Sequence, residues 1–145
     1  SAVTKIIDQE KIRDEVSLKP KLSFSAKRVT RRQNPLTFAE DWDRGTYVWF
    51  ETQCQEGEVL EYFFEKPLIA SSIECRSGVP QTIRSVVEHG VLEGSVDGNK
   101  FFKLANFIDG DAKADIRGKV LKKVRVRFLS EQSEWTALQD LIIYP

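Results

Sequence analysis

Short runs of alternating apolar and polar residues constrain this sequence more than any other feature. Residues 22–27, 60–65, 72–76 and 123–128 each place an apolar side chain at every second position. Successive side chains of a β-strand point to opposite faces, so a period of two predicts half-buried strands. Turn residues separate the runs, and no long amphipathic helical pattern interrupts them. The sequence therefore predicts an all-β sandwich or barrel.

Turn chemistry predicts where several strands end. Pro67 should close the strand that begins at Leu60, because proline cannot donate a backbone hydrogen bond. Asp97 and Gly98 predict a hairpin with a type I′ turn, in which both central residues have positive φ. A final, mostly buried strand is expected over residues 138–144.

Residues 1–21 are rich in charge and end near Pro20, so we interpret them as a linker or an edge segment. The single domain then spans residues 22–145. The chain begins with Ser1 and contains no Met, so we expect it to be a processed product or a piece of a longer protein, and favour the second. Cys54 and Cys75 could form one disulfide or remain as two buried thiols.

Composition excludes several classes of function. Lys plus Arg and Asp plus Glu each number 22, and the resulting zero charge argues against a nucleic-acid partner. One histidine and two cysteines cannot build a closed zinc site without carboxylates. No apolar run approaches the length of a membrane span. No nucleotide-binding or hydrolase motif occurs, and no carboxylate pair stands out, so we do not expect this chain to be an enzyme.

Four segments in order resemble the discoidin domain, also called the coagulation-factor type C domain, which includes carbohydrate-binding module family 32. The segments are 41–49, 60–68, 94–101 and the pair 123–127 with 138–144. The resemblance implies an eight-stranded jelly-roll β-sandwich, galactose-binding-domain-like, over residues 22–145. The sequence of residues 91–98 and 135–140 most resembles that of the C-terminal modules of bacterial family 20 hexosaminidases (chitobiases). Two departures stand out, because Trp42 replaces the family's glycine and Phe101 stands where tryptophan is common.

Candidate carbohydrate ligands lie in the segments expected to be loops or, for Arg76, directly after the apolar strand that ends at Cys75. Trp135 occupies a polar loop and could be the aromatic platform for a sugar ring, or a plug at the end of the sandwich. Arg76 resembles an arginine that many family 32 modules present to sugar hydroxyls, the alternative being a solvated side chain. Arg84, Glu88 and His89 share the long loop that follows.

The first segment of the resemblance carries two further predictions. Trp42 is either a second aromatic platform or a plug under the N-terminal segment, whereas Trp49 matches the family's core tryptophan. Many relatives bind a structural calcium ion at positions that correspond here to Asp41, Asp43, Thr46 and Asp140. The alternative is that these carboxylates stabilise turns. No essential cofactor is expected.

The resemblance implies a non-catalytic carbohydrate-binding module of a secreted or periplasmic bacterial glycoside hydrolase, of the β-N-acetylhexosaminidase type. Its partners would be a glycan of N-acetylhexosamine or galactose type and an upstream catalytic domain in the same polypeptide. The alternative is a structural or protein-interaction domain without sugar affinity. Membrane binding would need apolar spikes among basic residues, and the cluster Arg28, Arg31 and Arg32 has no such spike beside it. A membrane partner is therefore not expected.

Overall fold

The computed structural model describes residues 22–26, 29–39 and 45–144. The described residues form nine strands, where eight were expected, and one short 3-10 helix. The elements are β1 (Leu22–Ala26), η1 (Leu36–Ala39), β2 (Val48–Trp49), β3 (Val59–Leu68), β4 (Ser72–Ser77), β5 (Gly90–Ser95), β6 (Phe102–Asn106), β7 (Asp111–Asp115), β8 (Leu121–Phe128) and β9 (Ala137–Tyr144). No helix in these ranges is long and apolar enough to cross a membrane.

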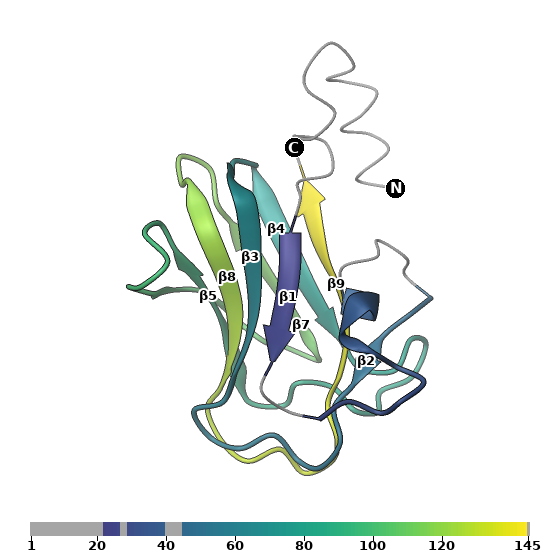
Figure 1. Cartoon of the computed structure of the whole chain (residues 1–145). Helices are drawn as coiled ribbons and strands as arrows, with labels where there is room; N and C mark the ends of the chain where they lie inside the picture. Colours follow the sequence, from purple (N-terminus) through teal and green to yellow (C-terminus); the bar gives the residue numbers. More distant parts are fainter. Residues whose placement is uncertain (1–21, 27–28, 40–44, 145) are drawn as a thin grey trace.

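The strands form two antiparallel sheets that pack face to face (Figure 1). The five-stranded sheet has the order β1-β3-β8-β5-β6, and the four-stranded sheet has the order β2-β9-β4-β7. Neighbours in both sheets are mostly distant in sequence; β3, for example, pairs with β1 and β8. The all-β sandwich prediction is confirmed.

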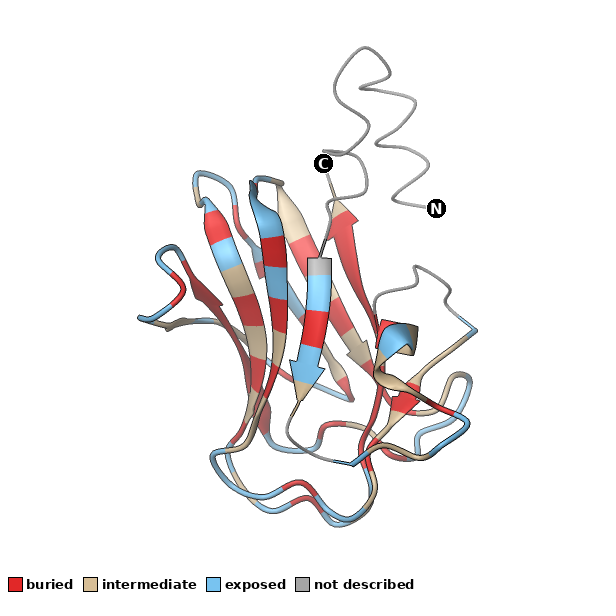
Figure 2. Ribbon diagram, in the orientation of Figure 1, coloured by how far each residue is buried: buried red, intermediate tan, exposed pale blue. Residues whose placement is uncertain are grey.

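The core lies between the two sheets and contains the residues that the alternation predicted. Tyr62 and Val126 from the five-stranded sheet, and Ile73 and Leu141 from the four-stranded sheet, are each at most 2% exposed. Figure 2 shows buried positions alternating with exposed or half-buried ones along β3 and β8. Burial of one face per strand therefore explains the period of two.

The predicted hairpin is confirmed, because β5 pairs antiparallel with β6, but two details of the turn predictions were wrong. β3 continues through Pro67 to Leu68, because a register shift between Phe63 and Leu68 accommodates the proline against β8. The β5–β6 connection is a loop over residues 96–101, and of its two predicted turn residues only Gly98 has a positive φ, +88°. Asp97 Oδ1 instead accepts hydrogen bonds of 2.8 Å from the backbone N–H groups of Asn99 and Lys100. The carboxylate organises this loop as an Asx turn.

Both cysteines are buried, and no disulfide joins them. Burial raises the pKa of the Cys75 thiol far above its ordinary range, and the nearby carboxylates of Asp111, Asp140 and Glu74 add to that shift. Cys75 therefore behaves as a small apolar core residue. The linker predicted for residues 1–21 lies outside the described residues.

Candidate functional site

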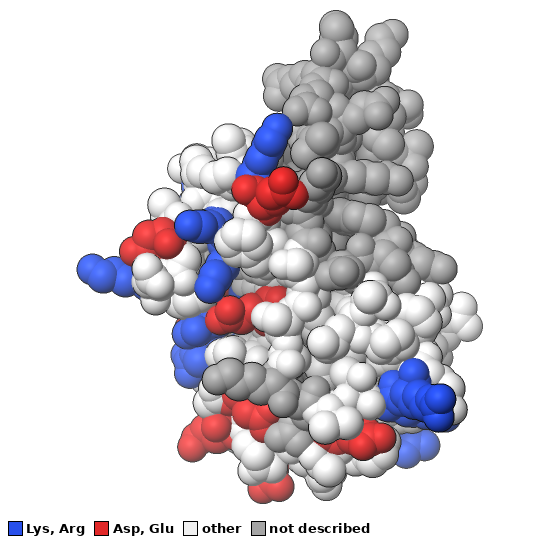
Figure 3. Space-filling model, in the orientation of Figure 1, with Lys and Arg blue, Asp and Glu red and all other residues white. Residues whose placement is uncertain are grey.

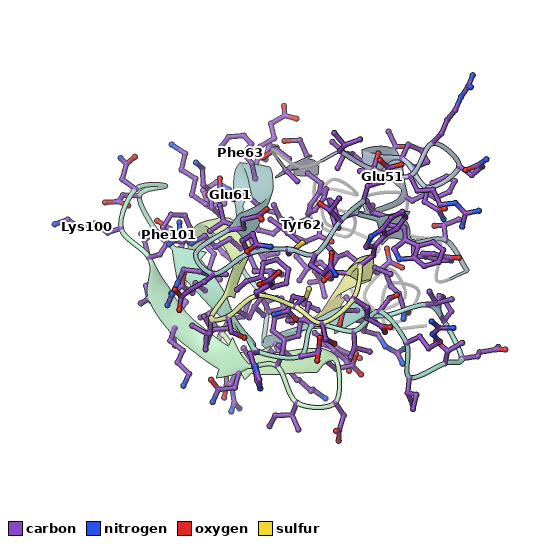
Figure 4. The ribbon with its side chains drawn as sticks, turned by 90° about the horizontal axis from the view of Figure 1, so that it is seen from below. Glu51, Glu61, Tyr62, Phe63, Lys100 and Phe101 are labelled. Atoms are coloured by element: carbon purple, nitrogen blue, oxygen red, sulfur yellow. The ribbon has the colours of Figure 1, made fainter. Side chains whose placement is uncertain are left out.

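Four connections gather at the lower end of the sandwich in Figure 1. They are residues 50–58, 78–89, 107–110 and 129–136. Loops held by rigid sheets are the places where binding residues concentrate. Figure 4 looks onto this end of the molecule.

The β4–β5 loop (residues 78–89) and the β8–β9 loop (residues 129–136) are tied together by backbone hydrogen bonds. Gly78 N donates to Ala137 O at 2.8 Å, and Ala137 N donates to Ser85 O at 2.8 Å. Leu129 N donates to His89 O at 3.0 Å. The two loops therefore form one structural unit, although they are far apart in the sequence.

Side chains complete this connection. Glu88 Oε1 accepts hydrogen bonds from both the backbone N–H and the hydroxyl of Ser133, each at 2.7 Å. The buried Gln132 accepts from the Glu88 N–H at 2.8 Å, and Glu134 accepts from Ser85 N–H. Glu88, predicted as a sugar ligand, therefore braces the two loops in this structure.

A pocket of about 660 Å³ opens between the β4–β5 loop and the start of β7. We call it the Arg76 pocket. Ligand sites are usually concave, with a few converging polar groups in an otherwise apolar lining. This pocket has both kinds of residue: Arg76, Ser77, Pro80, Gln81, Thr82, Ile83, Val86, Asp109, Asp111 and Gln139.

Arg76 supplies the positive charge of the pocket. It lies opposite Asp111 in the pairing of β4 with β7, on the outer face of the four-stranded sheet. Its Nε atom is 3.9 Å from Asp111 Oδ2, which is too long for a hydrogen bond. This buried Nε atom has no hydrogen-bond partner. The guanidinium is thus held by a loose ion pair, and the Arg76 side chain stays 39% exposed at the pocket.

Acceptors lie beside this donor. Burial raises the pKa of Asp111 above its ordinary value, and nearby Glu74 and Asp109 add to the shift, although Arg76 opposes it. Gln139 Nε2 donates to the backbone oxygens of Ser77 at 3.2 Å and Gly78 at 3.0 Å, which fixes the amide at the pocket. Donors and acceptors placed side by side suit hydroxyl groups, which both donate and accept.

Asp109, Asp111 and Gln139 line the pocket but were not predicted from the sequence. The run Asp109-Gly110-Asp111 was visible only as a turn, and it is the pairing of β7 with β4 that carries Asp111 to Arg76. The sequence signal that could have predicted these pocket residues is the pair of carboxylates, Asp109 and Asp111, on either side of the turn residue Gly110.

His89 lies at a different pocket, of about 380 Å³, lined by Glu88, His89, Gly90, Asn106, Phe107, Leu129 and Ser130. Its Nδ1 is 2.9 Å from the Ser130 hydroxyl oxygen. Arg84 lines neither pocket, and its exposed side chain pairs with Glu134 at 3.9 Å. The structure does not bring Arg76, Arg84 and His89 to one point.

Trp135 belongs to a third group, an aromatic cluster at the β2 edge. Its indole is 38% exposed, in agreement with the predicted loop position, and packs edge-on against Trp49 with ring centroids 6.1 Å apart. Tyr47 packs on Trp49 at 5.9 Å, and the Arg31 guanidinium lies 5.0 Å from the Trp49 ring. Trp49 is half-buried, so it lies at the rim of the core. Trp135 lines neither pocket.

Of the remaining predicted residues, the structure describes two, Thr46 and Asp140. Trp42, Asp41 and Asp43 lie outside the described residues. Thr46 is half-buried and Asp140 is buried. The described part of the chain contains no group of three or more His, Cys, Asp or Glu side chains that could hold a metal ion. The calcium site stays a prediction.

The outer face of the five-stranded sheet carries a charged network. Glu93 Oε1 accepts hydrogen bonds from Arg125 Nε at 2.9 Å and Arg127 Nε at 3.1 Å. The Arg125 guanidinium lies 3.7 Å from the ring centroid of Phe101, and Glu61 pairs with Arg125 at 3.8 Å. Figure 3 shows basic and acidic side chains interspersed over the described residues of this side, and Figure 4 shows Phe101 on the same side as Glu61. The carboxylates of Glu61 and Glu93 compensate the charges of the neighbouring arginines, and these ion pairs link β3, β5 and β8 within the sheet.

Comparison with known proteins identifies the fold. No family model matches the sequence, and no curated protein matches it. Solved structures do match. A family 32 carbohydrate-binding module, from a family 31 glycoside hydrolase of Clostridium perfringens, superposes with a TM-score of 0.68 at 12% identity, covering 86% of this chain and 94% of the module. The chain has the fold of family 32 modules.

Two further solved structures match this chain. A family 32 module from C. perfringens, solved with GalNAc-β-1,3-galactose, has a TM-score of 0.66 and 13% identity over 89% of this chain and 97% of its own. A family 89 glycoside hydrolase from the same species, solved with 2-acetamido-1,2-dideoxynojirimycin, has a TM-score of 0.63 and 18% identity over 85% of this chain. This chain spans 14% of the length of that hydrolase.

Proposed function

We propose that this chain is a non-catalytic carbohydrate-binding module that binds glycans in the Arg76 pocket. The observation that carries the proposal is the pocket itself, which combines a guanidinium, two carboxylates and an amide at the loop end of the sandwich. Bidentate polar side chains of this kind suit the vicinal hydroxyls of a sugar. The fold supports the proposal, because a module of this fold was solved with GalNAc-β-1,3-galactose.

We further propose that the module belongs to a secreted or periplasmic glycoside hydrolase, with the β-N-acetylhexosaminidase (chitobiase) type as the specific candidate. The resemblance of segments 91–98 and 135–140 supports this parent. A module tethered to a catalytic domain raises the effective concentration of that domain at a polymeric substrate. Weak binding at each site is then sufficient for function.

Titration of the chain with galactose, N-acetylgalactosamine, N-acetylglucosamine and chitooligosaccharides, followed by NMR, tests the proposal. A single shallow site should bind with a dissociation constant of about 1 mM, or about −4.1 kcal/mol. Arg76→Met should weaken binding at least about tenfold, because a hydrogen bond to a charged group contributes about 1.5–3 kcal/mol. Shifts should map to residues 76–86 and 109–111.

Arg117→Met is the matched control. Arg117 is also ion-paired, to Asp115 at 2.6 Å, but it follows β7 at the opposite end of the sandwich. Its replacement should leave sugar affinity unchanged. If no sugar shifts any resonance of the wild-type chain, the alternative of a structural or protein-interaction domain is the better account.

A further inference from the structure

The Arg76 pocket has two chemically different walls. Arg76, Asp109 and Asp111 form a polar wall on β4, the β6–β7 connection and β7. The β4–β5 loop contributes the apolar side chains Pro80, Ile83 and Val86, beside the polar Gln81 and Thr82, and we call these three apolar side chains the apolar wall. A sugar with hydroxyls alone would use the polar wall and leave the apolar wall in water.

Ile83 is the most exposed large apolar side chain among the described residues, at 92%. The tip of its loop is closed on itself, since Val79 N donates to Arg84 O at 3.0 Å and the Thr82 hydroxyl donates to Val79 O at 2.7 Å. Arg84 N in turn donates to Thr82 Oγ1 at 3.1 Å. These bonds within the tip hold Ile83 in place without burying it, so a ligand can cover it without first ordering the loop.

We propose that the Arg76 pocket selects sugars that carry an N-acyl group, with Ile83 as the specificity-determining residue. This inference rests on the proposed glycan-binding function of the same pocket. The ring hydroxyls of an N-acetylhexosamine face Arg76, Asp109 and Asp111. Its acetyl methyl packs against Ile83 and Val86 and removes apolar surface from water.

A free amine at the same carbon is the chemical alternative. Its positive charge would favour Asp109 and Asp111. The Arg76 guanidinium opposes a second cation in the pocket, and an ammonium group would gain nothing from Pro80, Ile83 and Val86. Arg76 offsets only one of the two carboxylates, so the preference for the acylated sugar rests on the apolar side chains.

The test compares three sugars of one stereochemical series: the hexose, the 2-amino sugar and the N-acetyl sugar, in both the galacto and the gluco series. In the series that binds, the dissociation constant of the N-acetyl sugar should be at least about fourfold lower than that of the hexose. This factor is the affinity gained by burying one methyl group. Transferred NMR contacts should join the acetyl methyl to the Ile83 side chain.

Ile83→Ser should bring the affinity ratio of the N-acetyl sugar to the hexose close to one, with hexose affinity unchanged. Because Ile83 is almost fully exposed, the variant should fold normally. Ile69→Ser is the matched control, since Ile69 is 75% exposed and lies just after β3 at the other end. It should keep the wild-type ratio.

Three results would overturn the inference while leaving glycan binding intact: equal affinity for hexose and N-acetyl sugar, tighter binding of the amino sugar, or an unchanged ratio in Ile83→Ser. Failure of every sugar to bind would instead reject the proposed function itself.

Discussion

Replacing Glu93 with glutamine should destabilise the domain by about 2 kcal/mol. The Glu93 side chain is 8% exposed although it lies on the outer face of β5. It accepts hydrogen bonds from Arg125 Nε and from both Nε and Nη2 of Arg127, at 2.9–3.1 Å. The variant would keep the shape of the side chain but leave two neighbouring guanidinium groups without their shared carboxylate.

The magnitude follows from burial. Breaking a fully buried ion pair costs about 3–5 kcal/mol, and hydrogen bonds to charged groups contribute about 1.5–3 kcal/mol. The Arg125 and Arg127 side chains are 21% and 36% exposed, so water screens part of the loss. The range of about 1.5–3 kcal/mol therefore applies to the loss of stability in Glu93→Gln. In a domain of this size, 2 kcal/mol corresponds to a decrease in Tm of about 8 °C.

The effect should depend on pH. Burial acts to raise the pKa of Glu93, but hydrogen bonds and charge from Arg127 and Arg125 outweigh it, so the pKa lies below its ordinary value. A depressed carboxyl pKa contributes stability that is complete above the unfolded pKa of about 4.3 and is lost as the pH falls through the folded pKa. The difference between wild type and Glu93→Gln should thus be full at pH 7 and should shrink below about pH 4.

Urea unfolding of both proteins at pH 7 and pH 3.5, followed by Trp fluorescence, measures these differences. Asp115→Asn is the matched control, because its ion pair with Arg117 is as short, 2.6 Å, but both side chains are well exposed. It should cause no measurable change. A Glu93→Gln variant within about 0.5 kcal/mol of wild type at pH 7, the range of an ordinary surface substitution, would refute the reasoning.

Three further predictions concern the lower end and the metal. Trp135→Ala should leave the fold intact, because Trp135 is exposed, and should leave sugar affinity unchanged, because Trp135 lines neither pocket. NMR titration beside a thermal melt measures both effects, and loss of sugar binding in a folded variant would move the site to the aromatic cluster around Trp49. Gly110→Ala should lower the free energy of unfolding in urea by more than 1 kcal/mol, because the φ of Gly110 is +88° and a Cβ atom there would lie 2.7 Å from Val86 Cγ1. Gly118→Ala is the control for backbone strain alone, because Gly118 has a φ of +78° but open space around it, and it should lower the free energy of unfolding less. Calcium at about 100 times its dissociation constant should add about 2.7 kcal/mol through the predicted ligands, and an unchanged melting temperature with calcium and with chelator would remove that site.

Much of the fold could be predicted because its signal is local. The alternation over residues 123–128 placed Val124, Val126 and Phe128 on one face, and all three are fully buried. The turn errors came from contacts that no local pattern records. Pro67 is accommodated by a register shift against another strand. Asp97 uses its carboxylate to hold a longer loop.

The candidate site was predicted only in part. Arg76 and Trp135 lie at the lower end as expected, but Arg76 lines a pocket and Trp135 packs on Trp49. Glu88 is used by Ser133 in the neighbouring loop, 45 residues away in the sequence. Sequence position showed that Trp135 and Glu88 were in loops, but not which partner each would meet.

The sequence by itself determined the strands with a clear alternation, β1, β3, β4 and β8, and the apolar face of each, because alternation acts between neighbouring residues of one strand. Only the tertiary structure decided which side chains line the Arg76 pocket together. Asp111 reaches Arg76 because β7 pairs with β4, and Gln139 reaches the same place because β9 pairs with the other edge of β4. The physical reason is that strand pairing is chosen by the packing of both sheets around one core, and this choice depends on the whole chain at once.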